Sequence, residues 1–197
     1  LQRRAVTGLD SVVIRAGDFF GGGSGTWIDQ AMVKDIGKGR LVYPGPLDRV
    51  HAWAYLPDLA RAFVLVAEAG GTPGTCDTLH FAGHTVTGAD WLAELTEVAW
   101  ERGWLPRAGA LQTGRLPWGL MRLASPLVPM AASLVAMRYL WEVPHALDGA
   151  SLARRIGAEP HTPFADAVRA AMAAQHPAPR GGGRPAVPHR RPTPQEA

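Results

Sequence analysis

Three side chains that could contact a ligand recur at every second position of one segment: His51, Trp53 and Tyr55. Residues two apart share one side of a β-strand, so these three lie together if the segment is extended. An imidazole can hydrogen-bond or carry a proton near neutral pH, and aromatic rings can wall a pocket or fill a core. The spacing therefore indicates one strand face that either contacts a ligand or belongs to the core.

The cysteine and histidine residues of the sequence do not predict a disulfide or a metal site. Cys76 is the only cysteine, which excludes an intrachain disulfide and a Cys-x-x-Cys motif. His80 and His84 are four residues apart, but the sequence places no set of carboxylates beside them or beside His145 that would complete a metal site. We predict no metal site, and the lone cysteine favours a reducing, cytoplasmic location.

A glycine-rich segment, Gly21-Gly22-Gly23-Ser24-Gly25, follows a short β-branched run. Glycine-rich turns between a strand and a helix can hold phosphate on free backbone amides. The spacing here is not Gly-x-Gly-x-x-Gly, and no acidic residue is placed to bind a ribose. A flexible loop and a phosphate contact both remain open.

Strand and helix patterns alternate along the chain. Strands are expected at 11–14, 41–43 and 78–81. Helices are expected after Asp58 as an N-cap, after the capping box Thr87-Gly88-Ala89-Asp90, from about Asp148 to Gly157, and after Thr162 as a cap. This alternation predicts an α/β layer structure with parallel strands.

A segment rich in Leu, Met and Trp follows Gly103 and is divided by prolines. Its longest uncharged run, residues 123–137, is shorter than the roughly 20 apolar residues that a bilayer crossing needs. We therefore expect a lid or core cover here, and no membrane contact.

The net charge of +3 is confined to the C-terminal segment, residues 175–197, which contains four arginines and one glutamate. Its six prolines and its Gly181-Gly182-Gly183 run predict disorder. We thus expect a folded unit over 1–174 and a disordered tail over 175–197. Because the rest of the chain is neutral, no nucleic-acid partner is predicted; a weak hold of the tail on nucleic acid or anionic lipid is the alternative.

Three segments, in order, resemble the C-terminal half of the extended short-chain dehydrogenases/reductases, the NAD-dependent epimerase/dehydratase family. The first, Val12-Val13-Ile14-Arg15-Ala16-Gly17-Asp18-Phe19-Phe20-Gly21, is similar to the family's strand and Arg-Pro-x-x-x-Tyr-Gly type loop. The second, residues 51–62, is similar to Arg-x-Phe-x-x-Val-x-Asp-x-Ala-x-Ala. The third, residues 152–157 with Pro160, Thr162 and Pro163, is similar to the segment before the family's last helix.

The resemblance implies the C-terminal part of a Rossmann-like doubly wound parallel sheet, with a mixed, mostly helical substrate-binding region. It implies NAD or NADP as cofactor, a small-molecule substrate and a possible homodimer. By the same resemblance, Ala16, Gly17 and Phe19 would lie beside the nicotinamide, and His51, Trp53 and Tyr55 would contact substrate. His51 stands where many members carry an arginine that pairs with a substrate diphosphate, which permits a smaller or less anionic substrate.

Two features of the family are missing. The chain has no glycine-rich dinucleotide turn, and none of its three tyrosines is followed four residues later by lysine: those positions hold Leu47, Leu59 and Val143. We therefore assign no catalytic residue. We interpret the chain, which begins at Leu1, as a truncated NAD(P)-dependent oxidoreductase or epimerase that is not catalytically competent alone. The alternative is a non-catalytic, ligand-sensing or regulatory relative on the same scaffold.

Overall fold

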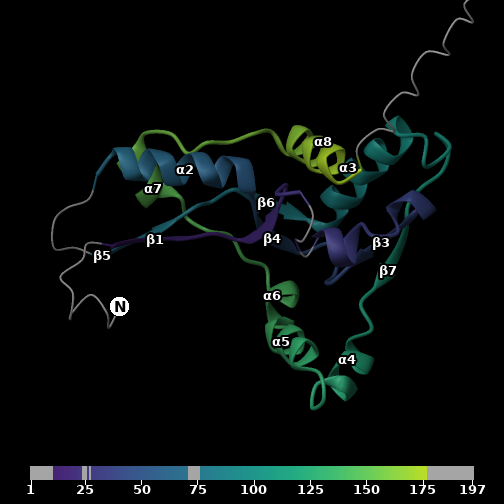
Figure 1. The fold of residues 1–197 in the computed structure, drawn as a ribbon. Coiled ribbons are helices and arrows are strands. Elements are labelled where there is room, and N and C mark those ends of the chain that lie inside the picture. The colour runs from purple at the N-terminus through teal and green to yellow at the C-terminus, as the bar shows by residue number, and fades with distance from the viewer. Residues whose placement is uncertain (1–10, 24–25, 27, 71–75, 177–197) are drawn as a thin grey trace, which may run out of the picture.

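The computed structural model describes residues 11–23, 26, 28–70 and 76–176, and shows short β-sheets covered by helices (Figure 1). The strands are β1 (Ser11–Arg15), β2 (Asp18–Phe20), β3 (Arg40–Tyr43), β4 (Val50–Tyr55), β5 (Cys76–His80), β6 (His84–Thr87) and β7 (Gln112–Arg115). The α-helices are α2 (Leu56–Glu68), α3 (Gly88–Glu101), α4 (Trp118–Ala124), α5 (Pro129–Met137), α6 (Tyr139–Glu142), α7 (Ala150–Ile156) and α8 (Phe164–Gln175). A π-helical turn, Ile28–Met32, and a 3-10 turn, Ile36–Lys38, precede β3.

The strands form three small sheets that are mostly parallel. β1 pairs with β5, β2 with β4 and β3 with β7, all in parallel. This confirms the predicted α/β class with parallel strands. One pair differs: β6 lies antiparallel to β4, because only three residues separate β5 from β6 and no helix crosses between them.

Two glycines allow β4 to lie between neighbouring strands. A Cβ atom on Gly17 would lie 2.1 Å from the carbonyl oxygen of Ala52, and one on Gly83 would lie 2.2 Å from that of Trp53. Gly17 directly precedes β2 and Gly83 directly precedes β6, the two strands that pair with β4. Successive carbonyls of a strand point to opposite edges, so each glycine permits close approach at one edge of β4.

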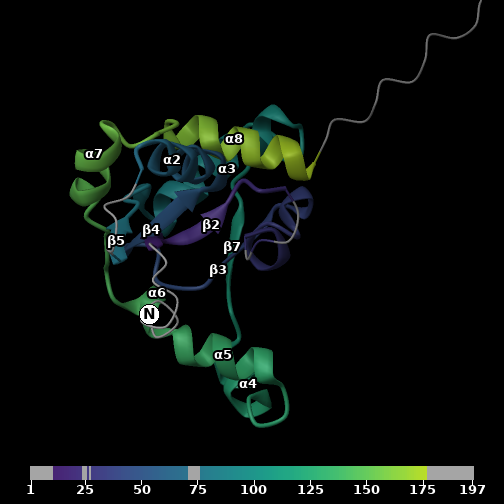
Figure 2. The same cartoon turned by 60° about the vertical axis from the view of Figure 1, so that its left-hand side comes forward.

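Helices α2, α3 and α8 lie on one side of the strands, and α4 and α5 project as a hairpin on the other side (Figures 1 and 2). The larger core cluster contains the fully buried Trp53, Trp91 and Phe20, and α8 closes it with Val168 and Met172. The hairpin carries exposed leucines, with Leu123 77% and Leu127 88% exposed. None of the helices in the described ranges has the length and apolar composition needed to cross a membrane.

The predicted caps are partly corrected by the structure. The capping box at Thr87 and Asp90 is confirmed: the Asp90 amide donates to Thr87 Oγ1, and the Thr87 amide donates to the Asp90 carboxylate. Asp58 does not cap α2. This helix begins two residues earlier, at Leu56, with Tyr55 at its N-cap position and Pro57 in its first turn. Thr162 does not cap α8, whose N-cap position is held by Pro163.

Asp58 and Thr162 instead bind each other. The Asp58 carboxylate, 1% exposed, accepts hydrogen bonds from the Thr162 amide at 2.6 Å and the Thr162 hydroxyl at 2.9 Å. A second carboxylate acts similarly, since Glu159 accepts from the amides of Ala82 and Gly83 at 2.9 and 2.8 Å. These two acidic side chains attach the segment before α8 to α2 and to the β5–β6 turn.

The proposed division at residue 174 stays a prediction. Helix α8 runs to Gln175, and residues 177–197, nearly all of the predicted tail, lie outside the described residues.

Candidate functional site

The centre of the candidate site is a contact between His51 on β4 and Asp18, the first residue of β2. The parallel register sets Asp18 opposite Trp53, two residues beyond His51 on the same strand face. His51 Nε2 lies 2.7 Å from Asp18 Oδ2, and His51 Nδ1 lies 3.2 Å from the carbonyl oxygen of Leu140. Both ring nitrogens therefore lie within hydrogen-bond distance of oxygen atoms.

Burial differs sharply between the two partners. The His51 side chain is 3% exposed, whereas that of Asp18 is 41% exposed. The imidazole is thus held inside the protein, and the carboxylate is partly open to solvent. A carboxylate oriented in this way can accept a hydrogen bond or a proton from a bound molecule.

Aromatic packing fixes the imidazole in this orientation. Trp141 stacks on it with ring centroids 4.0 Å apart and an interplanar angle of 5°. His145 meets it edge-on at 4.4 Å, and the His145 amide donates to the Val50 carbonyl at 3.3 Å. Helix α6 and the residues after it are thereby attached to β4.

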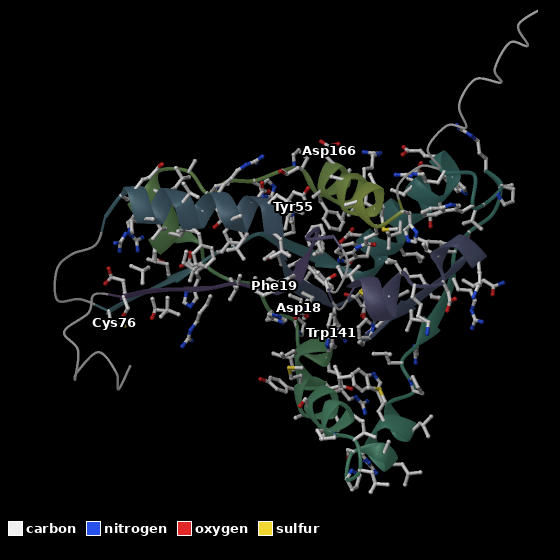
Figure 3. The ribbon with its side chains drawn as sticks, viewed as in Figure 1. Asp18, Phe19, Tyr55, Cys76, Trp141 and Asp166 are labelled. Atoms are coloured by element: carbon white, nitrogen blue, oxygen red, sulfur yellow. The ribbon has the colours of Figure 1, made fainter. Side chains whose placement is uncertain are left out.

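A cavity of about 110 Å³ opens beside the carboxylate. Asp18 is its single charged lining residue, and the other four are Leu134, Met137, Leu140 and Trp141 from α5 and α6. Figure 3 shows Asp18 and Trp141 close together where the strands meet the projecting helices. His51 and Trp53 are not among the lining residues of this cavity, and Asp18 is its charged group.

A second cavity, of about 160 Å³, lies between the loop after β3 and helices α4 and α6. The Trp118 indole lines it and donates to the Pro44 carbonyl at 2.9 Å. Arg138 lies 5.6 Å from the Trp118 ring centre and forms an ion pair with Glu142 at 2.7 Å. This cavity is more polar than the first, and Arg115 adds a further cation to its lining.

The structure places the predicted nicotinamide-side residues at the β1–β2 junction. Gly17 packs against the backbone of β4, so its small size is already required by that strand. Ala16 packs against the second core cluster, and Phe19 is 49% exposed on the opposite side of β2 from Phe20. Contact of Ala16, Gly17 or Phe19 with a nicotinamide stays a prediction.

The predicted substrate residues separate into two groups. His51 reaches the cavity through its bond to Asp18. Trp53 has no exposed surface and Tyr55 is 8% exposed, and both rings pack against Phe20 in the core. Direct substrate contact by His51, Trp53 or Tyr55 stays a prediction, and the core alternative fits the burial of both aromatic rings.

The buried tyrosines are not activated. Burial raises the pKa of both Tyr43 and Tyr55, which stabilises the neutral phenol. A tyrosine that transfers protons through its phenolate needs a shift in the other direction. Among the described residues, no group of three or more His, Cys, Asp or Glu could hold a metal ion.

Two residues of the site were missed by sequence reasoning. Asp18 stands in the first segment that carried the family resemblance, but the substrate role was assigned to the His51 strand alone. A polar residue at the start of a strand, next to a glycine, was the available signal. No contact of Trp141 was predicted, because its stacking on His51 joins residues 90 positions apart.

His84 gives this region a pH dependence. Burial is the main cause that lowers the pKa of His84 to about 4, helped by His161, whose ring lies 4.7 Å away. The folded protein thus keeps His84 neutral where the unfolded chain, with a pKa near 6.5, binds a proton. The free energy of unfolding should be highest above pH 6.5 and fall between pH 6.5 and 4, by about 2 kcal/mol from this group at pH 5.

Urea denaturation of the native chain and His84→Phe at pH 7.5 and 5.0 measures this effect. Between pH 7.5 and 5.0, the free energy of unfolding of the variant should fall by about 2 kcal/mol less than that of the native chain. His80→Phe on β5 is the matched control, and equal pH dependence in all three proteins would contradict the prediction.

No family model matches this chain, and no curated protein sequence matches it either. Solved structures do share its fold. dTDP-glucose 4,6-dehydratase from Streptomyces venezuelae, solved with NAD, is 19% identical, with a TM-score of 0.58 over 88% of this chain and 46% of its own. UDP-glucuronic acid 4-epimerase from Bacillus cereus, solved with UDP-glucuronic acid and NAD, is 14% identical, with a TM-score of 0.54 over 81% and 43%. dTDP-glucose 4,6-dehydratase from Bacillus anthracis, solved with NAD, is 12% identical, with a TM-score of 0.55 over 83% and 43%.

The predicted resemblance is thus confirmed at the level of the fold. The chain spans about half the length of the solved structures it matches.

Proposed function

We propose that this chain forms the substrate-side part of an NAD(P)-dependent oxidoreductase or epimerase. The observation that carries the proposal is the fold shared, over 88% of the chain, with an enzyme that was solved with NAD bound. The proposal includes a small-molecule substrate, a cytoplasmic location and a possible homodimer.

The described residues do not form a cradle for a dinucleotide. Gly17 is covered by the Ala52 carbonyl, and Gly21 by the Tyr55 ring, where an added Cβ would lie 2.3 Å from a ring carbon. We therefore assign the main binding of NAD or NADP to residues outside the described part of this chain, and derive no step through the cofactor. When bound, the cofactor accepts or donates the hydride.

The chain's own contribution is positioning and proton chemistry at one carboxylate. Asp18 lines the cavity, and His51 Nε2 lies 2.7 Å from its Oδ2. Packing of Trp141 and His145 against the imidazole keeps this geometry rigid. A substrate hydroxyl in the cavity would be oriented by the carboxylate, which can also accept its proton.

Cofactor binding tests the proposal. The intact mass of the native gene product is first compared with the 21.0 kDa of this chain. We then titrate NADH and NADPH by calorimetry into the native product and into the 197-residue chain. We expect micromolar binding to a heavier native product and binding at least about 100-fold weaker to this chain, a difference of roughly 2.7 kcal/mol. A heavier product that binds neither cofactor would refute the enzymatic proposal.

A second candidate is the ligand-sensing relative. It is favoured by the tyrosines: none is followed four residues later by a lysine, and the pKa values of Tyr43 and Tyr55 are raised. Its expected result is a native product of 21.0 kDa that binds a small molecule at the Asp18 cavity without any cofactor.

A further inference from the structure

We propose that the cavity beside Asp18 binds the apolar part of an alcohol and excludes phosphate groups. The substrate class would then be an apolar hydroxylated compound, not a sugar nucleotide. The identification as a substrate rests on the proposed function above; the binding site itself rests on the geometry of the cavity.

The lining of the cavity favours an apolar ligand. Leu134, Met137, Leu140 and Trp141 supply its walls, and Leu140 and Trp141 also fix His51. Burial of aliphatic carbon against such walls contributes about 0.8 kcal/mol per CH₂ group. A sugar ring, with a hydroxyl on most carbons, would leave those hydroxyls without partners along these walls.

The carboxylate selects the polar group of that ligand. His51 Nε2 lies 2.7 Å from Asp18 Oδ2, and we assign the second carboxylate oxygen as the acceptor for a ligand hydroxyl. A carboxylate oxygen is a hydrogen-bond acceptor, which matches an uncharged hydroxyl donor. An incoming phosphate would place two acceptors of the same sign together, which is unfavourable.

No cation in the cavity lining offsets that repulsion. Arg138 lines the second cavity, where Glu142 and the Trp118 ring hold it. His51 cannot supply the two parallel N–H donors with which an arginine binds a phosphate, because one of its nitrogens faces Asp18 and the other faces the Leu140 carbonyl. The solved dehydratase and epimerase act on sugar nucleotides, so this cavity indicates a different substrate class on the same fold.

The size of the cavity fixes the choice of probes. An apolar cavity of about 150 Å³ holds benzene, so the space of about 110 Å³ here takes the first few carbons of an aliphatic chain, whose remainder extends out of the cavity. Three probes share one six-carbon chain and differ in the head group: 1-hexanol, hexanoate and hexyl phosphate. The series isolates the effect of the head group.

The 197-residue chain is titrated with each probe, and binding is followed by NMR of the methyl groups of Leu134, Met137 and Leu140. We expect 1-hexanol to shift these methyl resonances and to bind at least about tenfold more tightly than hexyl phosphate or hexanoate. Equal or tighter binding of hexyl phosphate would overturn the proposal. Shifts confined to methyl groups outside the cavity would overturn it as well.

Two variants and a control locate the selectivity. Asp18→Asn keeps an oxygen for His51 and removes the negative charge, so the preference for 1-hexanol over hexyl phosphate should fall below about threefold. Leu134→Asn should weaken 1-hexanol about tenfold, and should weaken all three probes together. Asp166→Asn, on α8 and remote from the cavity in Figure 3, should leave every affinity unchanged. Selectivity that persists in Asp18→Asn would overturn the role of the carboxylate.

These measurements use no cofactor. If the native product binds the alcohol but neither NADH nor NADPH, the proposed binding site is supported and the proposed enzymatic function is refuted. If the native product binds a cofactor but shows no selectivity for the alcohol, the proposed enzymatic function is supported and this substrate class is refuted.

Discussion

Gly17→Ala should prevent the chain from reaching its native fold, or reduce the free energy of unfolding by about 4 kcal/mol or more. The new methyl group would lie 2.1 Å from the Ala52 carbonyl oxygen and 2.3 Å from its carbonyl carbon. Both atoms belong to the backbone of β4, so no side-chain rotation can relieve the overlap. Either β2 or β4 must move, and with it the register that sets Asp18 opposite Trp53.

Gly119→Ala is the matched control for this substitution. Gly119 lies in α4, and a Cβ added there would have no neighbour within 4 Å. Alanine is favoured over glycine inside a helix, so the control should be neutral or more stable by up to about 1 kcal/mol. Urea denaturation followed by tryptophan fluorescence compares the three proteins. A Gly17→Ala chain as stable as the Gly119→Ala chain would contradict the close packing at β4.

The same residue shows how far sequence reasoning reached. From the family resemblance, Gly17 was expected to lie beside the nicotinamide. The structure shows a close approach, and the backbone that approaches is β4. Sequence alone could not identify that partner, because it lies 35 positions further along the chain.

Features with a local cause were predicted well. The capping box at Thr87 and Asp90 depends on residues three apart, and it forms as expected. The strand β1 follows from its β-branched run, and the α/β class follows from the alternation of elements. In each case the signal and the structure occupy the same stretch of chain.

Features that join distant residues could not be predicted. The Asp18–His51 contact depends on the pairing of β2 with β4, and the stacking of Trp141 on His51 depends on the course of a proline-divided segment. Asp58 is the clearest case. A carboxylate before an apolar helical stripe is a good N-cap signal. The Asp58 carboxylate instead accepts a hydrogen bond from Thr162, which lies 104 residues further along the chain.

Asp58→Ala should reduce the free energy of unfolding by about 3 kcal/mol. The carboxylate is 1% exposed, and its loss leaves the Thr162 amide without the acceptor that now lies 2.6 Å away. The segment before α8 would lose its attachment to α2, so α8 and its buried Val168 and Met172 should become less well protected. Arg61 contributes little to this cost, since its side chain is 67% exposed and solvent screens its ion pair with Asp58.

A double-mutant cycle separates the two partners of Asp58. Asp58→Ala combined with Thr162→Val should show a coupling of about 1 kcal/mol or more in urea denaturation, and that coupling reports the hydroxyl alone because valine keeps the amide. The cycle with Arg61→Ala should give a coupling below about 0.5 kcal/mol. Asp166→Ala, at an exposed carboxylate, should reduce the free energy of unfolding by less than about 0.5 kcal/mol. If Asp58→Ala costs no more than Asp166→Ala, the contact with Thr162 does not stabilise the fold, and a cap-like role in the first turn of α2 becomes the better account of Asp58.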